Sequence, residues 1–210
     1  MRDDSECVIV NMVPLQLLAT VLMQAKHAPL TAIESEALSQ AKCQGAEEAW
    51  VTENGKEVLC LDYTNPKVKV NFESVGKLKP LYALRLLGND VKFGSLSPLR
   101  ALPSLGLLVI MGKGVNDDDL KEIGQMKRLD KLDIRGDSIT VSGLKQIQNL
   151  KKLRRLFLYG SKIKDSDLSA FEPMTWLEQL DLPPTVSQAR VEALKAKLPK
   201  CIVSRWDGKD

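Results

Sequence analysis

Residues 129–160 read LDKLDIRGDSITVSGLKQIQNLKKLRRLFLYG, and this stretch holds one complete unit of an internal repeat and the start of the next. The spacing L-x-x-L-x-L that opens it returns every 24 residues. Its copies are Leu81/Leu84/Leu86, Leu105/Leu108/Ile110, Leu129/Leu132/Ile134, Leu153/Leu156/Leu158 and Leu177/Leu180/Leu182. A glycine column with the same step contains Gly88, Gly112, Gly136 and Gly160. Columns that stay in register over five units predict a solenoid of stacked, similar turns.

Each unit combines a short strand with a helical return. Leu132 and Ile134 alternate with period 2, which predicts a strand with two side chains facing the core. Gly136 follows, where glycine permits a turn with positive φ. Leu144 and Ile147 then recur at i, i+3, the spacing of one buried helix face. The residues expected to cap the helices are Asn116 or Asp117, Thr140 and Asp165. One unit cannot bury its apolar side alone, so we expect the units to stack through a continuous parallel sheet.

These columns carry the pattern L-x-x-L-x-L-x-x-N/C-x-L, so the chain resembles leucine-rich-repeat proteins. The resemblance covers about residues 32–184. The ninth position departs from it, because the chain has Asn89, Lys113, Asp137 and Ser161 where the family commonly has an asparagine ladder. Residues 137–144 and 161–168 are similar to the repeats of planctomycete-type bacterial proteins, which read roughly LxxLxLxGTxVTDAGLxxLxxL. The resemblance implies an α/β solenoid, a right-handed βα superhelix with a parallel sheet on its concave face and a helical N-terminal cap. It implies little about function.

The two ends of the solenoid need shielding elements. Thr31 and Glu34 form a capping box that opens a helix over 32–42, with Ile33, Ala37, Leu38 and Ala41 expected on one face. Asn54-Gly55 predicts a hairpin turn before a first strand over 57–62, which lies one residue out of the 24-residue register. A helix over 187–198 and an edge strand over 201–204, covered by Trp206, are expected at the other end. The predicted division is 1–30 (apolar segment), 31–56 (capping helix and hairpin), 57–186 (repeats) and 187–210 (C-terminal cap).

Composition argues for a globular interaction domain and against catalysis. Of the 210 residues, 44% are hydrophobic and 27% are charged, and the net charge of +3 is too small to indicate a nucleic-acid partner. His27 is the only histidine, and the four cysteines form no C-x-x-C pair, so we expect no metal and no other cofactor. Scattered cysteines, expected to be reduced, favour an intracellular protein. No nucleophile elbow, phosphate loop or zinc-protease motif occurs, and we expect no enzyme activity.

Residues 8–25 form an apolar segment with three interpretations. Pro14 and several polar residues argue against a membrane span, and the acidic start lacks the basic region of a signal peptide. We favour a structural cap and a cytoplasmic protein. The alternatives are export, if the segment is a targeting signal, and a membrane anchor.

The concave face is the candidate binding surface. Leu87, Leu107, Val109 and Met111 form an apolar cluster that the core does not require, and an Arg-plus-aromatic group lies beside it. Arginine and aromatic residues are enriched at the energetic centres of protein interfaces. The predicted partner-binding residues are Arg85, Leu87, Leu107, Val109, Met111, Lys131, Asp133, Arg135, Arg155, Phe157, Tyr159, Gln179 and Asp181.

These residues predict a monomeric, non-catalytic scaffold that binds a protein or peptide, with no nucleic acid and no membrane as partner. Two alternatives stay open. Residues 1–30 could fold across the apolar cluster, or they could anchor a structural component in a membrane or a larger assembly.

Two charged runs have a sharp and a plain interpretation. Lys127-Arg128 and the run 151–155 could bind nucleic acid or acidic lipid, but nearby acids and the small net charge favour solvated turns. Asp117, Asp118 and Asp119 could hold a cation, but three acids at a helix start also complement the helix dipole, and we favour that role.

Overall fold

The computed structural model describes residues 28–53, 56–65, 69–88, 95–159 and 162–206, and it contains one eight-stranded sheet in the order of the sequence. The expectations for residues 8–25 and for His27 therefore lie outside the described residues. The strands are β1 (Glu47–Glu53), β2 (Lys56–Tyr63), β3 (Leu81–Leu87), β4 (Leu107–Met111), β5 (Lys131–Arg135), β6 (Arg155–Tyr159), β7 (Gln179–Leu182) and β8 (Ile202–Arg205). Only β1 and β2 pair antiparallel, and every later pair is parallel.

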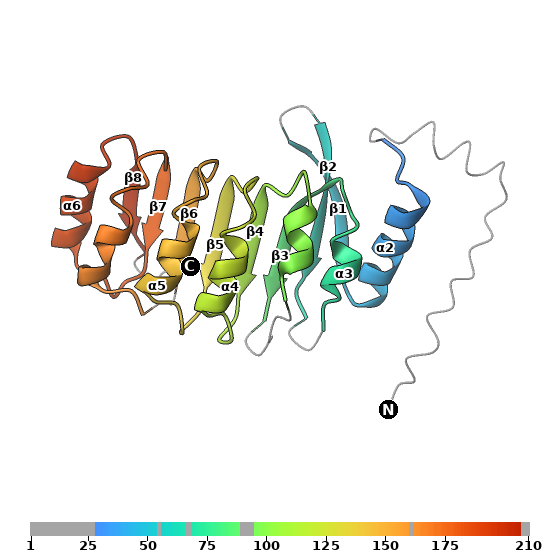
Figure 1. Ribbon diagram of the computed structural model, residues 1–210, viewed down its shortest axis with the longest axis horizontal. Helices are drawn as coiled ribbons and strands as arrows, with labels where there is room; N and C mark the ends of the chain where they lie inside the picture. Colours follow the sequence, from blue (N-terminus) through green and yellow to red (C-terminus); the bar gives the residue numbers. More distant parts are fainter. Residues whose placement is uncertain (1–27, 54–55, 66–68, 89–94, 160–161, 207–210) are drawn as a thin grey trace.

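A short helix or helical turn connects each strand to the next along most of the chain. These elements are α2 (Ala32–Cys43), α3 (Phe72–Val75), the 3-10 helix η1 (Ser97–Ala101), α4 (Asp117–Ile123), α5 (Val141–Ile147), the 3-10 helix η2 (Asp165–Ala170) and α6 (Gln188–Lys197). The labelled helices all lie on one side of the sheet, so the molecule has two layers that extend along one axis (Figure 1).

The strand register confirms the 24-residue repeat. Leu108 pairs with Leu132, and Leu132 pairs with Leu156, each one repeat further on. At the N-terminal end Leu61 pairs with Leu84, a step of 23 residues, as predicted for a first strand one residue out of register. The hairpin is also confirmed, because Glu53 pairs with Lys56 across a two-residue connection. The predicted α/β solenoid with a parallel sheet is therefore the observed architecture.

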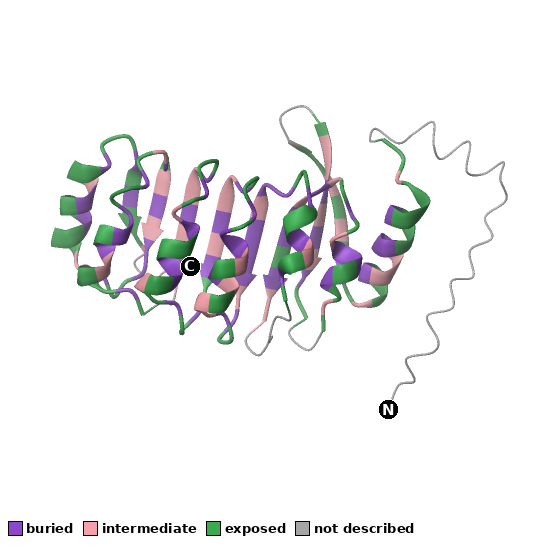
Figure 2. Ribbon diagram, viewed as in Figure 1, coloured by how far each residue is buried: buried purple, intermediate pink, exposed green. Residues whose placement is uncertain are grey.

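The core lies between the sheet and the helices. The inward-facing side chains of β5, Leu132 and Ile134, have no exposed surface, and neither does Ile147 on α5. Figure 2 shows the same alternation along the molecule, with buried residues on the helix sides that face the sheet and exposed residues on the outer sides. Each fully buried leucine or isoleucine contributes about 1.5–3 kcal/mol of transfer free energy, so the repeated columns supply the main stabilisation of the solenoid.

Helix α2 starts with the predicted capping box but turns a different residue inward. Thr31 accepts a hydrogen bond from the Glu34 backbone N–H, and the Glu34 carboxylate accepts from the Thr31 backbone N–H at 2.8 Å. Glu34 is buried by this pairing together with Ala37, Leu38 and Ala41. Ile33 is 64% exposed, so its predicted place on the buried face is wrong. The reciprocal cap fixes the rotation of the first turn and outweighs the burial of one isoleucine.

The glycine column serves close packing, not a left-handed turn. Gly45, which follows α2, is the only described glycine with a positive φ, at 85°. A Cβ at Gly136 would lie 2.8 Å from both the Cβ and the carbonyl oxygen of Val115 in the preceding repeat. The predicted positive φ at Gly136 is therefore wrong, and this glycine is required because two turns stack closely there.

Two aspartates connect neighbouring repeats through their helix starts. The Asp117 carboxylate accepts hydrogen bonds from the backbone N–H and hydroxyl of Thr140, at 2.9 and 2.6 Å. The Asp165 carboxylate holds Ser187 in the same way, at 2.7 and 2.6 Å. Asn116 and Thr140 cap α4 and α5 as predicted. Asp165 was predicted to cap its own helix, but it lies inside η2 and reaches the next repeat.

The cysteines differ from the expectation of reduced thiols at one position. Cys60 and Cys201 are free, whereas Cys43 is disulfide-bonded. The expectation is therefore wrong for Cys43.

Candidate protein-binding surface

The sheet face opposite the helices, here called the open face, carries three rows of side chains that run across the strands. All thirteen predicted binding residues lie in these rows, because the parallel register places equivalent residues side by side. The first row is Ala83, Leu107, Lys131, Arg155 and Gln179. The second is Asp62, Arg85, Val109, Asp133, Phe157, Asp181 and Ser204, and the third is Leu87, Met111, Arg135 and Tyr159.

The apolar cluster is less exposed than the sequence implied. Val109 is only 6% exposed, and Leu87, Leu107 and Met111 are half-buried. Val109 is the middle residue of its strand, so neighbouring strands cover it on both sides. The accessible part of the cluster therefore comes from Leu87, Leu107 and Met111.

An aromatic group extends the open face toward the C-terminal end. The rings of Phe157 and Tyr159 are stacked with centroids 6.4 Å apart, and Trp206 meets Tyr159 edge to face at 5.4 Å. The Lys131 ammonium lies 5.5 Å from the centre of the Phe157 ring. Trp206 was predicted only to cover the last strand, yet it joins this group. The pairing of Gln179 with Ile202 places Trp206 in the third row, a position that requires knowing the shortened last step.

Charged residues on the open face differ in how they are paired. Arg85 forms an ion pair with Asp62 at 3.0 Å, and Arg155 forms one with Asp130 at 3.5 Å. Asp181 accepts hydrogen bonds from Ser204 and from Gln179. Arg135 is exposed and forms no ion pair with any residue that the structure describes. Its guanidinium group is therefore available to a ligand.

Asp133 is the most perturbed acid on this face. Burial raises the pKa of its carboxyl to about 6, and Asp181 adds to the rise while Lys131 and Arg85 oppose it. Its Oδ1 atom is buried without a hydrogen-bond partner among the described residues. An unsatisfied buried oxygen costs free energy, and a donor from a ligand would remove that cost.

A hollow of about 370 Å³ lies where the third row meets the turns after the strands. Leu87, Met111 and Arg135 line it together with Lys113 and Asp137. Two apolar walls with a free guanidinium at the side suit an apolar side chain that carries or adjoins an acceptor group.

The comparisons with known proteins concern the fold. No family model and no curated protein matches the chain. Among solved structures, it is similar to a leucine-rich-repeat protein of Leptospira interrogans, with 27% identity over 62% of this chain and 33% of that one and a TM-score of 0.45. It is also similar to internalin C2 of Listeria monocytogenes, with 17% identity over 85% and 87% of the two chains and a TM-score of 0.47. A third is the leucine-rich-repeat ectodomain of the receptor kinase SOBIR1 of Arabidopsis thaliana, with 16% identity over 84% and 93% and a TM-score of 0.36.

The assignment of the fold rests on the chain itself, in which apolar columns and paired parallel strands advance together by 24 residues. The chain has the leucine-rich-repeat fold. It spans about a third of the length of the Leptospira leucine-rich-repeat protein.

Two searches of this leucine-rich-repeat domain gave no site or span within the described residues. No group of three or more His, Cys, Asp or Glu side chains there is placed to hold a metal ion. No helix in the same residues is long and apolar enough to cross a bilayer. Asp119, which was considered as part of a cation site, instead accepts a hydrogen bond from the Asn116 backbone N–H at 3.0 Å.

Proposed function

We propose that the chain is a non-catalytic scaffold that binds a protein or peptide partner on the open face. The observation that carries this proposal is the contact group formed by Phe157, Tyr159 and Trp206 beside the unpaired Arg135. Aromatic and arginine side chains dominate binding energy at protein interfaces. The rings contact one another before any ligand arrives, so little side-chain entropy is lost on binding.

The face also indicates what the partner must offer. The half-buried Leu87 and Met111 suit an apolar side chain, and Arg135 suits an acceptor such as a carboxylate or carbonyl. The unsatisfied Oδ1 of Asp133 suits a donor. This alternation of donor, acceptor and apolar contacts is typical of an extended peptide or a protein loop.

The test uses two substitutions with the same charge change. Arg135→Glu alters the open face, and Lys145→Glu alters an exposed position on α5, on the opposite side of the sheet. Partners captured by chemical crosslinking are purified and titrated against the wild type and both variants. We expect Arg135→Glu to weaken binding at least about tenfold, since loss of a central charged contact costs roughly 2 kcal/mol or more, and Lys145→Glu to have no effect.

A partner that binds the Arg135→Glu variant as tightly as the wild type would contradict the proposal, and so would equal weakening by both variants. Sedimentation of the wild type with its partner measures the stoichiometry. A monomeric scaffold gives a one-to-one complex, whereas a component of a larger assembly forms oligomers without the partner.

A further inference from the structure

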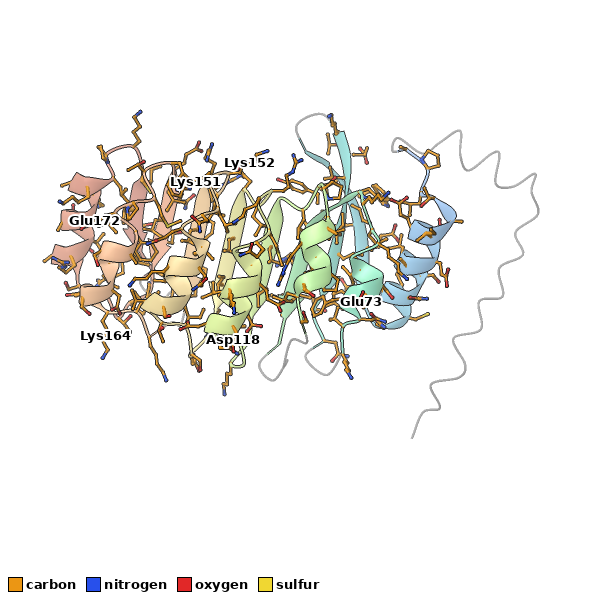
Figure 3. The ribbon with its side chains drawn as sticks, viewed as in Figure 1. Glu73, Asp118, Lys151, Lys152, Lys164 and Glu172 are labelled. Carbon is orange, nitrogen blue, oxygen red and sulfur yellow. The ribbon has the colours of Figure 1, made fainter. Side chains whose placement is uncertain are left out.

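A second, strongly polar hollow of about 590 Å³ lies at the edge of the sheet where strands β3 to β7 begin. Four basic side chains line it, namely Arg128, Lys152, Arg154 and Arg155. Lys152 is visible at this edge in Figure 3, opposite the edge that carries Asp118 and Lys164. We call this site the basic hollow.

The basic residues of these turns divide into two groups. The Lys127 ammonium donates to the Gly124 carbonyl at 2.6 Å and so satisfies the end of α4. The Lys151 ammonium donates to the Gln148 carbonyl at 3.2 Å and lies 3.5 Å from the centre of the Trp176 ring. Both lysines are therefore held by the helical layer, while the residue after each of them, Arg128 and Lys152, lines the basic hollow. A uniformly solvated turn would not separate neighbouring residues in this way.

Carboxylates already occupy half of the positive charge in the basic hollow. Arg155 is 3.5 Å from Asp130, and Arg154 is 3.5 Å from Glu178. Arg128 and Lys152 form no ion pair with any residue in the described part of the chain. Four cations against two acids leave a net charge of about +2 in a concave site.

The backbone at this edge offers a ligand little to bind. The carbonyls of Gly106, Asp130 and Arg154 each accept two backbone N–H groups from the next repeat, at 2.7–3.0 Å. The chemistry of the basic hollow is therefore that of its side chains, and a ligand must supply acceptors for Arg128 and Lys152.

We propose that the basic hollow binds the carboxylate side chains of an acidic segment in the same partner that occupies the open face, and this inference rests on the proposed function. Arg155 belongs both to the first row of the open face and to the wall of the basic hollow, so one extended ligand can contact both. Asp130 and Glu178 favour carboxylates over phosphates, because they repel a doubly charged group more strongly than a singly charged one.

The test uses a hexaglutamate peptide with a fluorescent label, titrated at about 50 mM salt, where surface charges are weakly screened. Arg128→Glu/Lys152→Glu reverses the two unpaired charges. Lys127→Glu/Lys151→Glu is the matched control, since it makes the same charge change at the adjacent residues. We expect the first variant to bind hexaglutamate at least about tenfold more weakly than the wild type, and the control to stay within about threefold of it.

Equal weakening in both variants would overturn the proposal, because it would show binding by net charge alone. Tighter binding of hexathymidylate, lost in the same variant, would overturn it in favour of a phosphate ligand. Circular dichroism checks folding, and Arg128→Gln/Lys152→Gln replaces the first variant if that one unfolds. Arg135→Glu should leave hexaglutamate binding unchanged, so failure of the basic hollow and failure of the open face give different results.

Discussion

At the scale of single residues, Asp133 couples the candidate binding face to stability. Its carboxyl has a pKa of about 6 in the folded chain, against an ordinary value of 3.8. A raised folded pKa means that the folded state holds the proton more tightly, so stability falls as pH rises from about 4 to 6. A shift of about two units corresponds to roughly 3 kcal/mol. Allowing for screening by solvent at this half-buried position reduces it to about 1–2 kcal/mol.

Asp133→Asn should therefore raise the free energy of unfolding at pH 7 relative to the wild type, by about 1–2 kcal/mol more than at pH 4. Urea denaturation at both pH values measures the difference. Asp137→Asn, at an exposed position of the following turn, is the control and should show no such change with pH. A wild type and an Asp133→Asn variant that differ equally at pH 4 and pH 7 would show that the carboxyl is not perturbed.

Sequence periodicity predicts the position of a side chain better than its exposure. The 24-residue step placed Val109 correctly in a row of the open face, but it could not reveal that only 6% of the side chain is exposed. Exposure depends on the sizes of the neighbours across two strands. Ile33 shows the complementary error, because a single hydrogen-bonded cap decided which face of the first turn is buried.

At the scale of elements, Asp117 joins two repeats at the start of their helices. Its carboxylate holds both donors of Thr140, and a Cβ at Gly143 would collide with that carboxylate. Asp117→Ala should lower the free energy of unfolding by about 1–2 kcal/mol, since two hydrogen bonds are lost.

Asp118 provides the matched control for this prediction. It is exposed in the same helical turn, and Asp118→Ala removes the same charge without touching Thr140. Thermal unfolding of both variants separates the inter-repeat contact from the effect of charge on the helix dipole. Equal destabilisation by the two substitutions would mean that the dipole, not the contact with Thr140, is the source of the stability.

The type of helical turn is less predictable than its place. Leu96 and Leu99, like Leu168 and Phe171, sit in the same apolar columns as residues of true α-helices, yet they belong to or flank the 3-10 helices η1 and η2. The columns require only inward side chains at i and i+3, which both helix types satisfy. Pro98 in the first turn of η1 removes a backbone donor and shortens the element.

At the scale of the whole molecule, the sequence predicts the stacking but not the basic hollow. Repetition fixes the order of strands and the three rows of the open face, because both follow from one step length. The basic hollow depends on which way neighbouring side chains turn. Lys151 and Lys152 are indistinguishable in the sequence, and only the Gln148 carbonyl and the Trp176 ring draw Lys151 away.

A stack of similar units also predicts how stability is distributed along the chain. β5 pairs with β4 and β6, whereas β8 pairs with β7 alone. In a solenoid each repeat is stabilised by its neighbours, so end units open more readily than central ones. We expect the backbone amides of Leu132 and Ile134 to exchange with deuterium at least about tenfold more slowly than that of Val203. Mass spectrometry of peptic fragments measures these rates. Uniform protection from β3 to β8 would show instead that the repeats unfold as one cooperative unit, with the end repeats as stable as the centre.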